Sequence, residues 1–161
     1  MKTTLIASSV VFSCAVVSMG CASDMKSSTS GYDEGRTSNR IAPASLYDRL
    51  GGKPAITAVI DDFVGRVAAD NRINGKFVNA NIPHLKMMLV EQVCQASGGP
   101  CTYTGPDMKT IHAGMQITNE QFDALVRDLV ESLNNFHVGE REKEEILSVL
   151  GPMRKDIVTA M

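Results

Sequence analysis

Two pairs of adjacent glycines, Gly51-Gly52 and Gly98-Gly99, constrain the fold of this chain more than any other sequence feature. Glycine lacks a Cβ and adopts backbone conformations that strain other residues, so helices commonly end where it occurs. The segments around the two pairs carry apolar residues at helical spacings of three and four, and none alternates apolar with polar residues as a strand does. The sequence therefore predicts an all-α fold whose helices are joined by sharp turns.

The first glycine pair separates two predicted helices. Ala44-Ser45 precedes a short helix that begins at Leu46 and stops at Gly51-Gly52, and Pro54 then suits the first turn of the next helix. That longer helix is expected to end at residues 70–71. Its predicted buried stripe is Ile56, Val59, Ile60, Phe63, Val64 and Val67.

Three more helices are predicted downstream. One begins at Pro83 and ends at the second glycine pair, and the next starts at a capping box formed by Thr118 and Gln121. Gly139 separates a last helix that continues to Ile157. The expected apolar faces are Leu85, Met88, Leu89, Gln92, Val93 and Ala96 in the first, Phe122, Leu125, Val126, Leu129, Val130 and Leu133 in the second, and Ile146, Leu147, Val149, Leu150, Met153 and Ile157 in the last.

Residues 1–20 are typical of a secretion signal. Lys2 precedes an apolar run over residues 5–17, which is shorter than the roughly 20 residues that span a bilayer. Ser18 and Gly20 before Cys21 are similar to a bacterial lipoprotein cleavage site, at which the cysteine is acylated; cleavage near Ala22 without a lipid is the alternative. We therefore expect an exported protein in the bacterial periplasm or at the outer membrane, attached to the membrane only through a lipid on Cys21.

The rest of the chain divides into a linker and one domain. Residues 21–44 are rich in Ser, Thr, Gly, Asp and Arg, a composition that predicts a disordered tether. Residues 45–161 are enough for one domain with its own core. The formal net charge is only −2 and the basic residues are scattered among acids, which excludes nucleic acid as a partner, because phosphates require a clustered basic face.

Two cysteines remain beyond the first 21 residues. Cys94 and Cys101 are seven residues apart across Gly98-Gly99-Pro100, a turn that would allow a disulfide in an oxidising compartment. The alternative is two free thiols, with Cys94 buried on a helix. The sequence leaves both possibilities open.

The order of these motifs resembles the group I truncated haemoglobins. The opening run from Leu46 to Gly52, then Phe77, Gly98-Gly99 and His112, occur in family order with family-like spacing over residues 45–158. The resemblance implies a truncated globin fold, a two-on-two helical sandwich, that binds a diatomic gas on haem. His112 is then the proximal iron ligand. The motif of two cysteines followed by histidine that attaches haem covalently is absent from the sequence, so we expect non-covalent haem b.

The resemblance also implies which side chains surround the haem. Phe77 matches a phenylalanine that packs on the macrocycle, and His84 would lie near a propionate group. Met108 precedes His112 by one helical turn and would pack beside the ring. The full set of expected haem contacts is Phe63, Val64, Phe77, His84, Leu85, Met88, Leu89, Tyr103, Met108, His112 and Phe122.

The distal side departs from the family pattern. Members of the group commonly carry a tyrosine on the second helix and a glutamine on the helix over the haem, which donate hydrogen bonds to bound oxygen; here these positions match Val64 and Leu89. Leu85 lies one turn before Leu89. The sequence predicts an apolar distal pocket in which oxygen is held weakly, and leaves open whether Tyr103 or Tyr47 supplies a donor instead.

Three functions remain open from the sequence. The first is reversible binding of oxygen, nitric oxide or carbon monoxide to haem on His112, with a nitric oxide dioxygenase-like or redox side activity undecided. The second is electron transfer to an unidentified redox partner, with Met88 as the second axial ligand beside His112. The third is an exported helical module that binds no haem.

Overall fold

The computed structural model describes residues 43–160, and the predictions for the signal, for Cys21 and for the linker up to residue 42 lie outside this range. The helices are α1 (Leu46–Arg49), α2 (Gly52–Ala69), η1 (Asn74–Phe77), α3 (Ile82–Ala96), α4 (Met108–Ile111), α5 (Asn119–Asn135), α6 (Glu140–Leu150), η2 (Gly151–Met153) and α7 (Arg154–Ile157). The only β-type pairing in residues 43–160 is an isolated bridge between Ile117 and Val158. The all-α prediction is confirmed. Within this range, no helix has the length and apolar character to cross a membrane.

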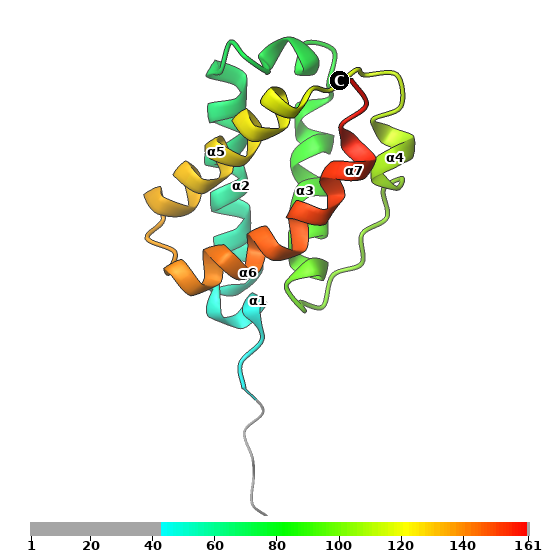
Figure 1. Cartoon of the computed structure of the whole chain (residues 1–161). Helices are drawn as coiled ribbons and strands as arrows, with labels where there is room; N and C mark the ends of the chain where they lie inside the picture. Colours follow the sequence, from blue (N-terminus) through cyan, green and yellow to red (C-terminus); the bar gives the residue numbers. More distant parts are fainter. Residues whose placement is uncertain (1–42, 161) are drawn as a thin grey trace, which may run out of the picture. The chain divides into compact units, whose positions relative to one another are not determined.

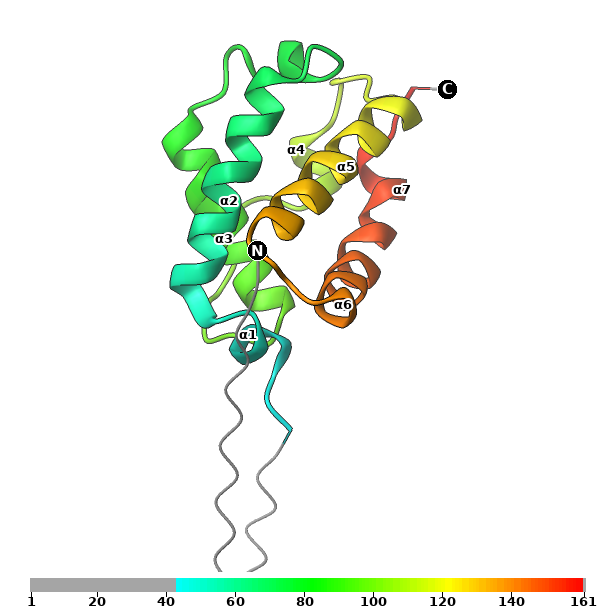
Figure 2. The ribbon, with the colours of Figure 1, turned by 90° about the vertical axis from the view of Figure 1, so that its left-hand side faces the viewer.

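The long helices form two layers. α2 and α3 pack against each other, and α5 packs across α2 (Figure 1). α5 and the run from α6 to α7 make the second layer, which Figure 2 shows beside α2 and α3. The short α4 lies next to α7 at the edge of the molecule in Figure 1. This arrangement is the predicted two-on-two helical sandwich.

Both glycine pairs occupy turns that other residues would strain. Gly51 and Gly52 have φ values of 93° and 72°, in the left-handed region, which turns the chain from α1 into α2. Gly98 has a φ of 82° and follows the end of α3. A Cβ on Gly99 would lie 2.4 Å from the Tyr47 ring and 2.7 Å from Cys94 Sγ, so only glycine fits there.

Cys94 and Cys101 form a disulfide with a Cα–Cα distance of 5.7 Å. The possible pairing in the sequence is confirmed, and the alternative of two free thiols is wrong. Cys94 has no exposed surface and belongs to the core, whereas Cys101 is partly buried against it. The bond therefore joins the last turn of α3 to the loop that leads to α4.

The predicted apolar faces serve two purposes in the structure. The whole predicted stripe of α2 is buried. On α3, the residues buried against the core are Val90 and Cys94, while most of the predicted face lines a cavity between the layers. On α5, Phe122 and Leu133 are buried, but Val130 neither is fully buried nor lines that cavity. Periodicity identified the apolar faces but did not distinguish a core from a cavity wall.

The last predicted helix is wrong in one respect, because the chain does not continue as one helix to Ile157. α6 ends at Leu150, and Gly151-Pro152 begins the short η2. Proline lacks the N–H that an α-helix needs at this point, which breaks the helix. Val149, within α6, is 40% exposed, while Ile157 on α7 is buried. Beyond α7, the backbone N–H groups of residues 159 and 160 donate to the Ile117 carbonyl at 3.0 and 3.1 Å.

A buried carboxylate lies where α5 faces the end of α2. Asp128 is 6% exposed, and its Oδ2 has no hydrogen-bond partner among the described residues. Arg72 lies 3.8 Å away. Burial raises the pKa of Asp128, and the nearby Asp70 carboxylate raises it further against the opposing effect of Arg72. The charged form of Asp128 therefore destabilises the fold at neutral pH.

Asp128→Asn should raise the free energy of unfolding at pH 7 by about 1 kcal/mol, the low end of the cost of a buried polar atom without a partner. The pKa of Asp128 is higher in the folded protein than in the unfolded chain, where it is about 3.9. Protonated Asp128 therefore contributes its full stabilisation below about pH 3.9, and this contribution is lost as the pH rises through the folded-state pKa. Urea unfolding at pH 4 and pH 7 measures this pH dependence of stability.

Asp70→Asn is the matched comparison. Arg72 lowers the pKa of Asp70, so this substitution should lower the free energy of unfolding at pH 7. A loss of stability in Asp128→Asn at pH 7 would show that the Arg72 pair outweighs burial.

Candidate functional site

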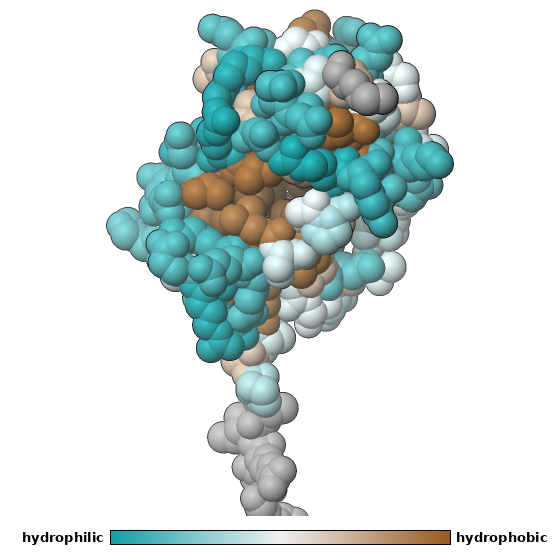
Figure 3. Space-filling model, in the orientation of Figure 1, coloured by the Kyte–Doolittle hydropathy of each residue, from teal (hydrophilic) through white to brown (hydrophobic). Residues whose placement is uncertain are grey.

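A large apolar cavity lies between the two layers and opens to solvent. Figure 3 shows apolar residues gathered in a hollow in the middle of one face. The empty space between the lining atoms, the open mouth included, is about 1090 Å³. Residues from α2, α3, α4, α5 and the C-terminal helices line it, and the lining side chains that carry nitrogen or oxygen are Gln92, Tyr103 and His112. A cavity with this apolar lining and an open mouth suits a ligand with apolar faces.

Ten of the eleven predicted contact residues line this cavity. They are Phe63, Val64, Phe77, Leu85, Met88, Leu89, Tyr103, Met108, His112 and Phe122. The exception is His84, which is exposed in the first turn of α3 and whose backbone N–H donates to Asn81 Oδ1 at 3.1 Å. His84 is outside the lining residues, and its role near a propionate stays a prediction.

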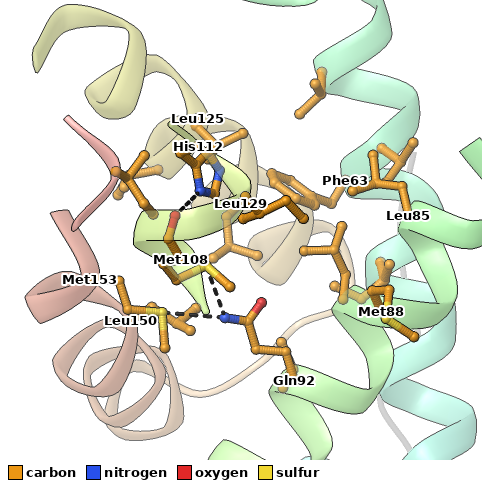
Figure 4. A pocket seen from close by; sticks show the side chains of 18 of the residues that line it. Phe63, Leu85, Met88, Gln92, Met108, His112, Leu125, Leu129, Leu150 and Met153 are labelled. Carbon is orange, nitrogen blue, oxygen red and sulfur yellow. Dashed lines mark hydrogen bonds between the residues drawn. The ribbon is translucent and has the colours of Figure 1, made fainter. Parts of the chain in front are cut away.

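His112 follows directly after α4, which Asp107 caps by accepting a hydrogen bond from the Thr110 N–H at 2.9 Å. The His112 ring is half-buried, and its Nδ1 lies 2.8 Å from the Met108 carbonyl oxygen (Figure 4). A carbonyl oxygen can only accept, so in the neutral imidazole Nδ1 carries the proton and Nε2 has the free lone pair. Metal-binding histidines are oriented by this kind of hydrogen bond. His112 can thus ligate a metal through Nε2 at the cavity wall.

The wall opposite His112 is apolar. Phe63 on α2 and Leu85 and Met88 on α3 lie across the cavity from His112 in Figure 4. Val64 and Leu89 line the same cavity, so the two positions where the sequence lacks the family's polar pair do face the ligand space. Neither side chain can donate a hydrogen bond.

The tyrosine hydroxyls do not restore a donor. The ring of Tyr103 lines the cavity, but its hydroxyl donates to the Pro106 carbonyl at 2.9 Å. Burial, together with the charges of Asp107 and Glu91, raises the pKa of Tyr103, so the phenol stays protonated and keeps this bond at neutral pH. The Tyr47 hydroxyl accepts from the Lys53 N–H at 3.0 Å, and Tyr47 is not a lining residue. The question that the sequence left open is answered for both residues.

Gln92 is a polar lining residue that the predicted contact set omitted. Its Nε2 lies 3.3 Å from Met153 Sδ and 3.6 Å from Met108 Sδ, and both sulfurs are weak acceptors (Figure 4). Its position on the same stripe of α3 as Leu85 and Met88 was the available signal. The other lining residues outside the predicted set are Ile60, Val67, Val93, Ile111, Leu125, Val126, Leu129, Leu150, Met153 and Ile157.

Other potential metal ligands in the described part of the chain do not cluster. Residues 43–160 contain no group of three or more His, Cys, Asp or Glu side chains that could hold an ion. The third histidine, His137, is exposed in the turn between α5 and α6 and has a φ of 55°. Within this range, His112 is the single histidine that lines the apolar cavity and is the candidate metal ligand.

Comparisons with known proteins agree with this geometry. The sequence pattern of the family described as "Bacterial-like globin" matches residues 45–159. The group 1 truncated hemoglobin of Mycolicibacterium paratuberculosis is 38% identical over 120 residues, which cover 74% of this chain and 88% of that protein.

Two solved structures are similar at 30% identity, and each match covers 71% of this chain and 98% of the other. They are the truncated hemoglobin of Tetrahymena pyriformis in its Fe(III) form, with a TM-score of 0.69, and the 2/2 hemoglobin of a Synechococcus species with covalently attached heme, with a TM-score of 0.68. The sequence match over most of the chain, together with these relatives, shows that the protein belongs to the bacterial-like globin family, among the group 1 truncated haemoglobins.

Proposed function

We propose that this globin holds haem b in the cavity between its layers, with His112 Nε2 as the iron ligand, and binds a diatomic gas on the face of α2 and α3. Membership of the globin family supports haem and gas binding in general. The observation that carries the assignment to His112 is the 2.8 Å contact between its Nδ1 and the Met108 carbonyl, which in the neutral ring places the proton on Nδ1 and the lone pair on Nε2 at an apolar wall.

The lining residues fit haem. A porphyrin has two apolar faces, and burial of such surface in an apolar cavity is favourable by about 25 cal/mol per Å². The cavity also opens to solvent (Figure 3), so that carboxylates at one edge of the ring can remain hydrated. When bound, haem would supply an iron to which a diatomic gas can bind.

The cysteines support non-covalent attachment. Cys94 and Cys101 are the two cysteines of the described range, and both thiols are consumed in the disulfide. Neither can therefore form a thioether to the cofactor. The Synechococcus relative is described with covalently attached heme, so the mode of attachment requires its own test here. We expect acidified butanone to extract all of the haem.

The distal wall supports weak retention of oxygen. A hydrogen bond from the protein stabilises the charge that oxygen acquires when it binds, and Val64 and Leu89 offer none. Carbon monoxide and nitric oxide depend less on such a donor. We infer a site that exchanges oxygen rapidly and holds carbon monoxide or nitric oxide without comparable loss.

Export is part of the same proposal. Disulfides persist in oxidising compartments, and the Cys94–Cys101 bond supports a location outside the cytoplasm. The predicted lipid on Cys21 would then be the only attachment to a membrane.

Absorption spectra of the purified protein with one equivalent of haem test the proposed function. We expect sharp haem bands, a five-coordinate ferrous form and a stable carbon monoxide complex. A protein that stays helical by circular dichroism but shows no bound haem would overturn the proposal.

Met88→Leu separates gas binding from electron transfer. Met88 lies across the cavity from His112 (Figure 4), so a second axial ligand is geometrically reasonable and electron transfer is the second candidate. We expect the ferric and ferrous spectra of Met88→Leu to match the wild type, because a flexible methionine in a cavity wall packs like leucine. Met87→Leu, at a 49% exposed position on the same helix, is the control. A low-spin ferrous spectrum that disappears only in Met88→Leu would favour electron transfer.

A further inference from the structure

We propose that the Cys94–Cys101 disulfide is a redox lock on haem retention. When a dithiol reduces it, the segment that carries His112 loses its covalent attachment to α3 and haem leaves faster. The inference rests on the proposed function, because it concerns how firmly His112 is held. It goes beyond that function by making retention of the cofactor depend on the thiol–disulfide balance around the protein.

The need for a lock arises from the short helix before His112. α4 has four residues, and its main packing partner is the equally short α7. The chain between α3 and α4, residues 97–107, has no regular secondary structure. A helix of one turn does not hold its own position, since short helices are marginal without tertiary packing. The place of His112 therefore depends on what fixes the chain on each side of α4.

After His112, the chain is held by a polar contact. Lys76 on η1 donates from Nζ to the Met115 carbonyl at 2.7 Å and to the Gln116 carbonyl at 3.4 Å. These bonds tie the turn after His112 to η1, next to the lining residue Phe77. They are reversible contacts that do not respond to thiols.

Before His112, the disulfide is the covalent attachment. Backbone hydrogen bonds hold Gly98 and Gly99 to the end of α3. Beyond Gly99, the Tyr103 N–H donates to Gln95 Oε1, and the Thr104 hydroxyl donates to Glu91 Oε2 at 3.2 Å. Both involve exposed groups and compete with water. Reduction would leave the loop beyond Gly99 attached to α3 by these exposed bonds, by the weak contact of Gln92 with Met108 Sδ and by the chain itself.

The two cysteines of the disulfide differ in how deeply they are buried. Cys94 is fully buried beneath Gly99, where Tyr47 also packs, while Cys101 is partly exposed. A dithiol can therefore reach Cys101 Sγ first. Its thiolate forms a sulfur–sulfur bond with Cys101 Sγ as the bond to Cys94 breaks, and the Cys94 thiolate takes a proton.

The second thiol of the reductant then displaces Cys101. The net result is two protein thiols and one oxidised dithiol. The bond that closed the loop is gone, and the chain from Ser97 to Asp107 gains conformations that the disulfide had excluded. Tyr103, Met108 and His112 all lie in or after this segment and all line the cavity. The same event therefore loosens one wall of the cavity and the candidate iron ligand.

The test measures the rate of haem loss from the ferric holoprotein to excess apomyoglobin. One sample keeps the disulfide; a second is reduced with dithiothreitol, freed of reductant under nitrogen and shown to hold two titratable thiols. We expect haem to leave the reduced protein about tenfold faster. This change is smaller than the effect that a disulfide typically has on folding stability. Circular dichroism must show that the reduced protein keeps its helices.

Cys94→Ala combined with Cys101→Ser is the matched control. This variant should lose haem at the rate of the reduced wild type, and pretreatment with dithiothreitol should not change that rate. If the variant does not fold, the comparison of oxidised and reduced wild type still decides. Equal rates of haem loss from the two wild-type samples would overturn the lock. If the oxidised wild type binds no haem, the proposed function itself fails.

Discussion

Replacing His112 with glycine should lower haem affinity by roughly a hundredfold or more. Loss of a residue that only hydrogen-bonds a metal ligand already lowers metal affinity about tenfold to a hundredfold. The substitution removes the one side chain of the cavity that presents a free nitrogen lone pair at its wall. The apolar walls would still attract haem, so residual weak binding is expected. Haem titration followed by absorbance measures the change.

Imidazole makes this test specific. Added to His112→Gly, it can occupy the space of the missing ring and should restore a histidine-type spectrum. His137→Asn is the matched control, because His137 is exposed and its φ of 55° is one that asparagine tolerates. If His112→Gly bound haem with wild-type affinity and an unchanged spectrum, another ligand would hold the iron.

The second large effect is expected from Val64→Tyr combined with Leu89→Gln, which restores two donors on the apolar wall. Each hydrogen bond contributes about 0.5 to 1.5 kcal/mol, so oxygen should dissociate roughly fivefold to a hundredfold more slowly. Stopped-flow mixing of the oxygen complex with carbon monoxide gives the rate. Carbon monoxide dissociation should change much less, since carbon monoxide accepts a hydrogen bond weakly.

The control for this pair is a matched increase in size without donors. Val64 is 5% exposed, so a larger ring must displace its neighbours. Val64→Phe with Leu89→Met adds comparable bulk and no hydrogen-bond donor. Equal oxygen rates in the two double variants would show that space, and not hydrogen bonding, governs release.

The elements that the sequence predicted correctly are those set by neighbouring residues. The capping box of Thr118 and Gln121 and the glycine pairs act over a few positions, and each begins or ends a helix where expected. The break at Gly151-Pro152 was also local, but the apolar repeat continues across it to Ile157 and concealed it. Local signals compete, and here proline outweighed periodicity.

The details of the site depend on how the helices cross, and the spacing of apolar residues along the chain does not predict these crossings. His112 and the apolar wall followed from the order of motifs along the chain. The contact of Gln92 with Met153 requires α3 to pass beside the C-terminal elements. The Tyr103 hydroxyl turns to Pro106 because Gly105 lets the ring fold over the loop: a Cβ there would lie 2.3 Å from Oη. Such tertiary contacts required the structure.

The C-terminal pairing carries a consequence for the order of events during synthesis. The cavity wall draws on residues from Ile60 to Ile157, and the segment after Ile157 is fastened to Ile117 by two backbone hydrogen bonds. A nascent chain that still lacks this segment can form α2, α3 and α5 but cannot close the cavity. Domains fold as units once their parts are available. The complete cavity wall therefore forms only after the segment up to residue 160 has been synthesised and has paired with Ile117.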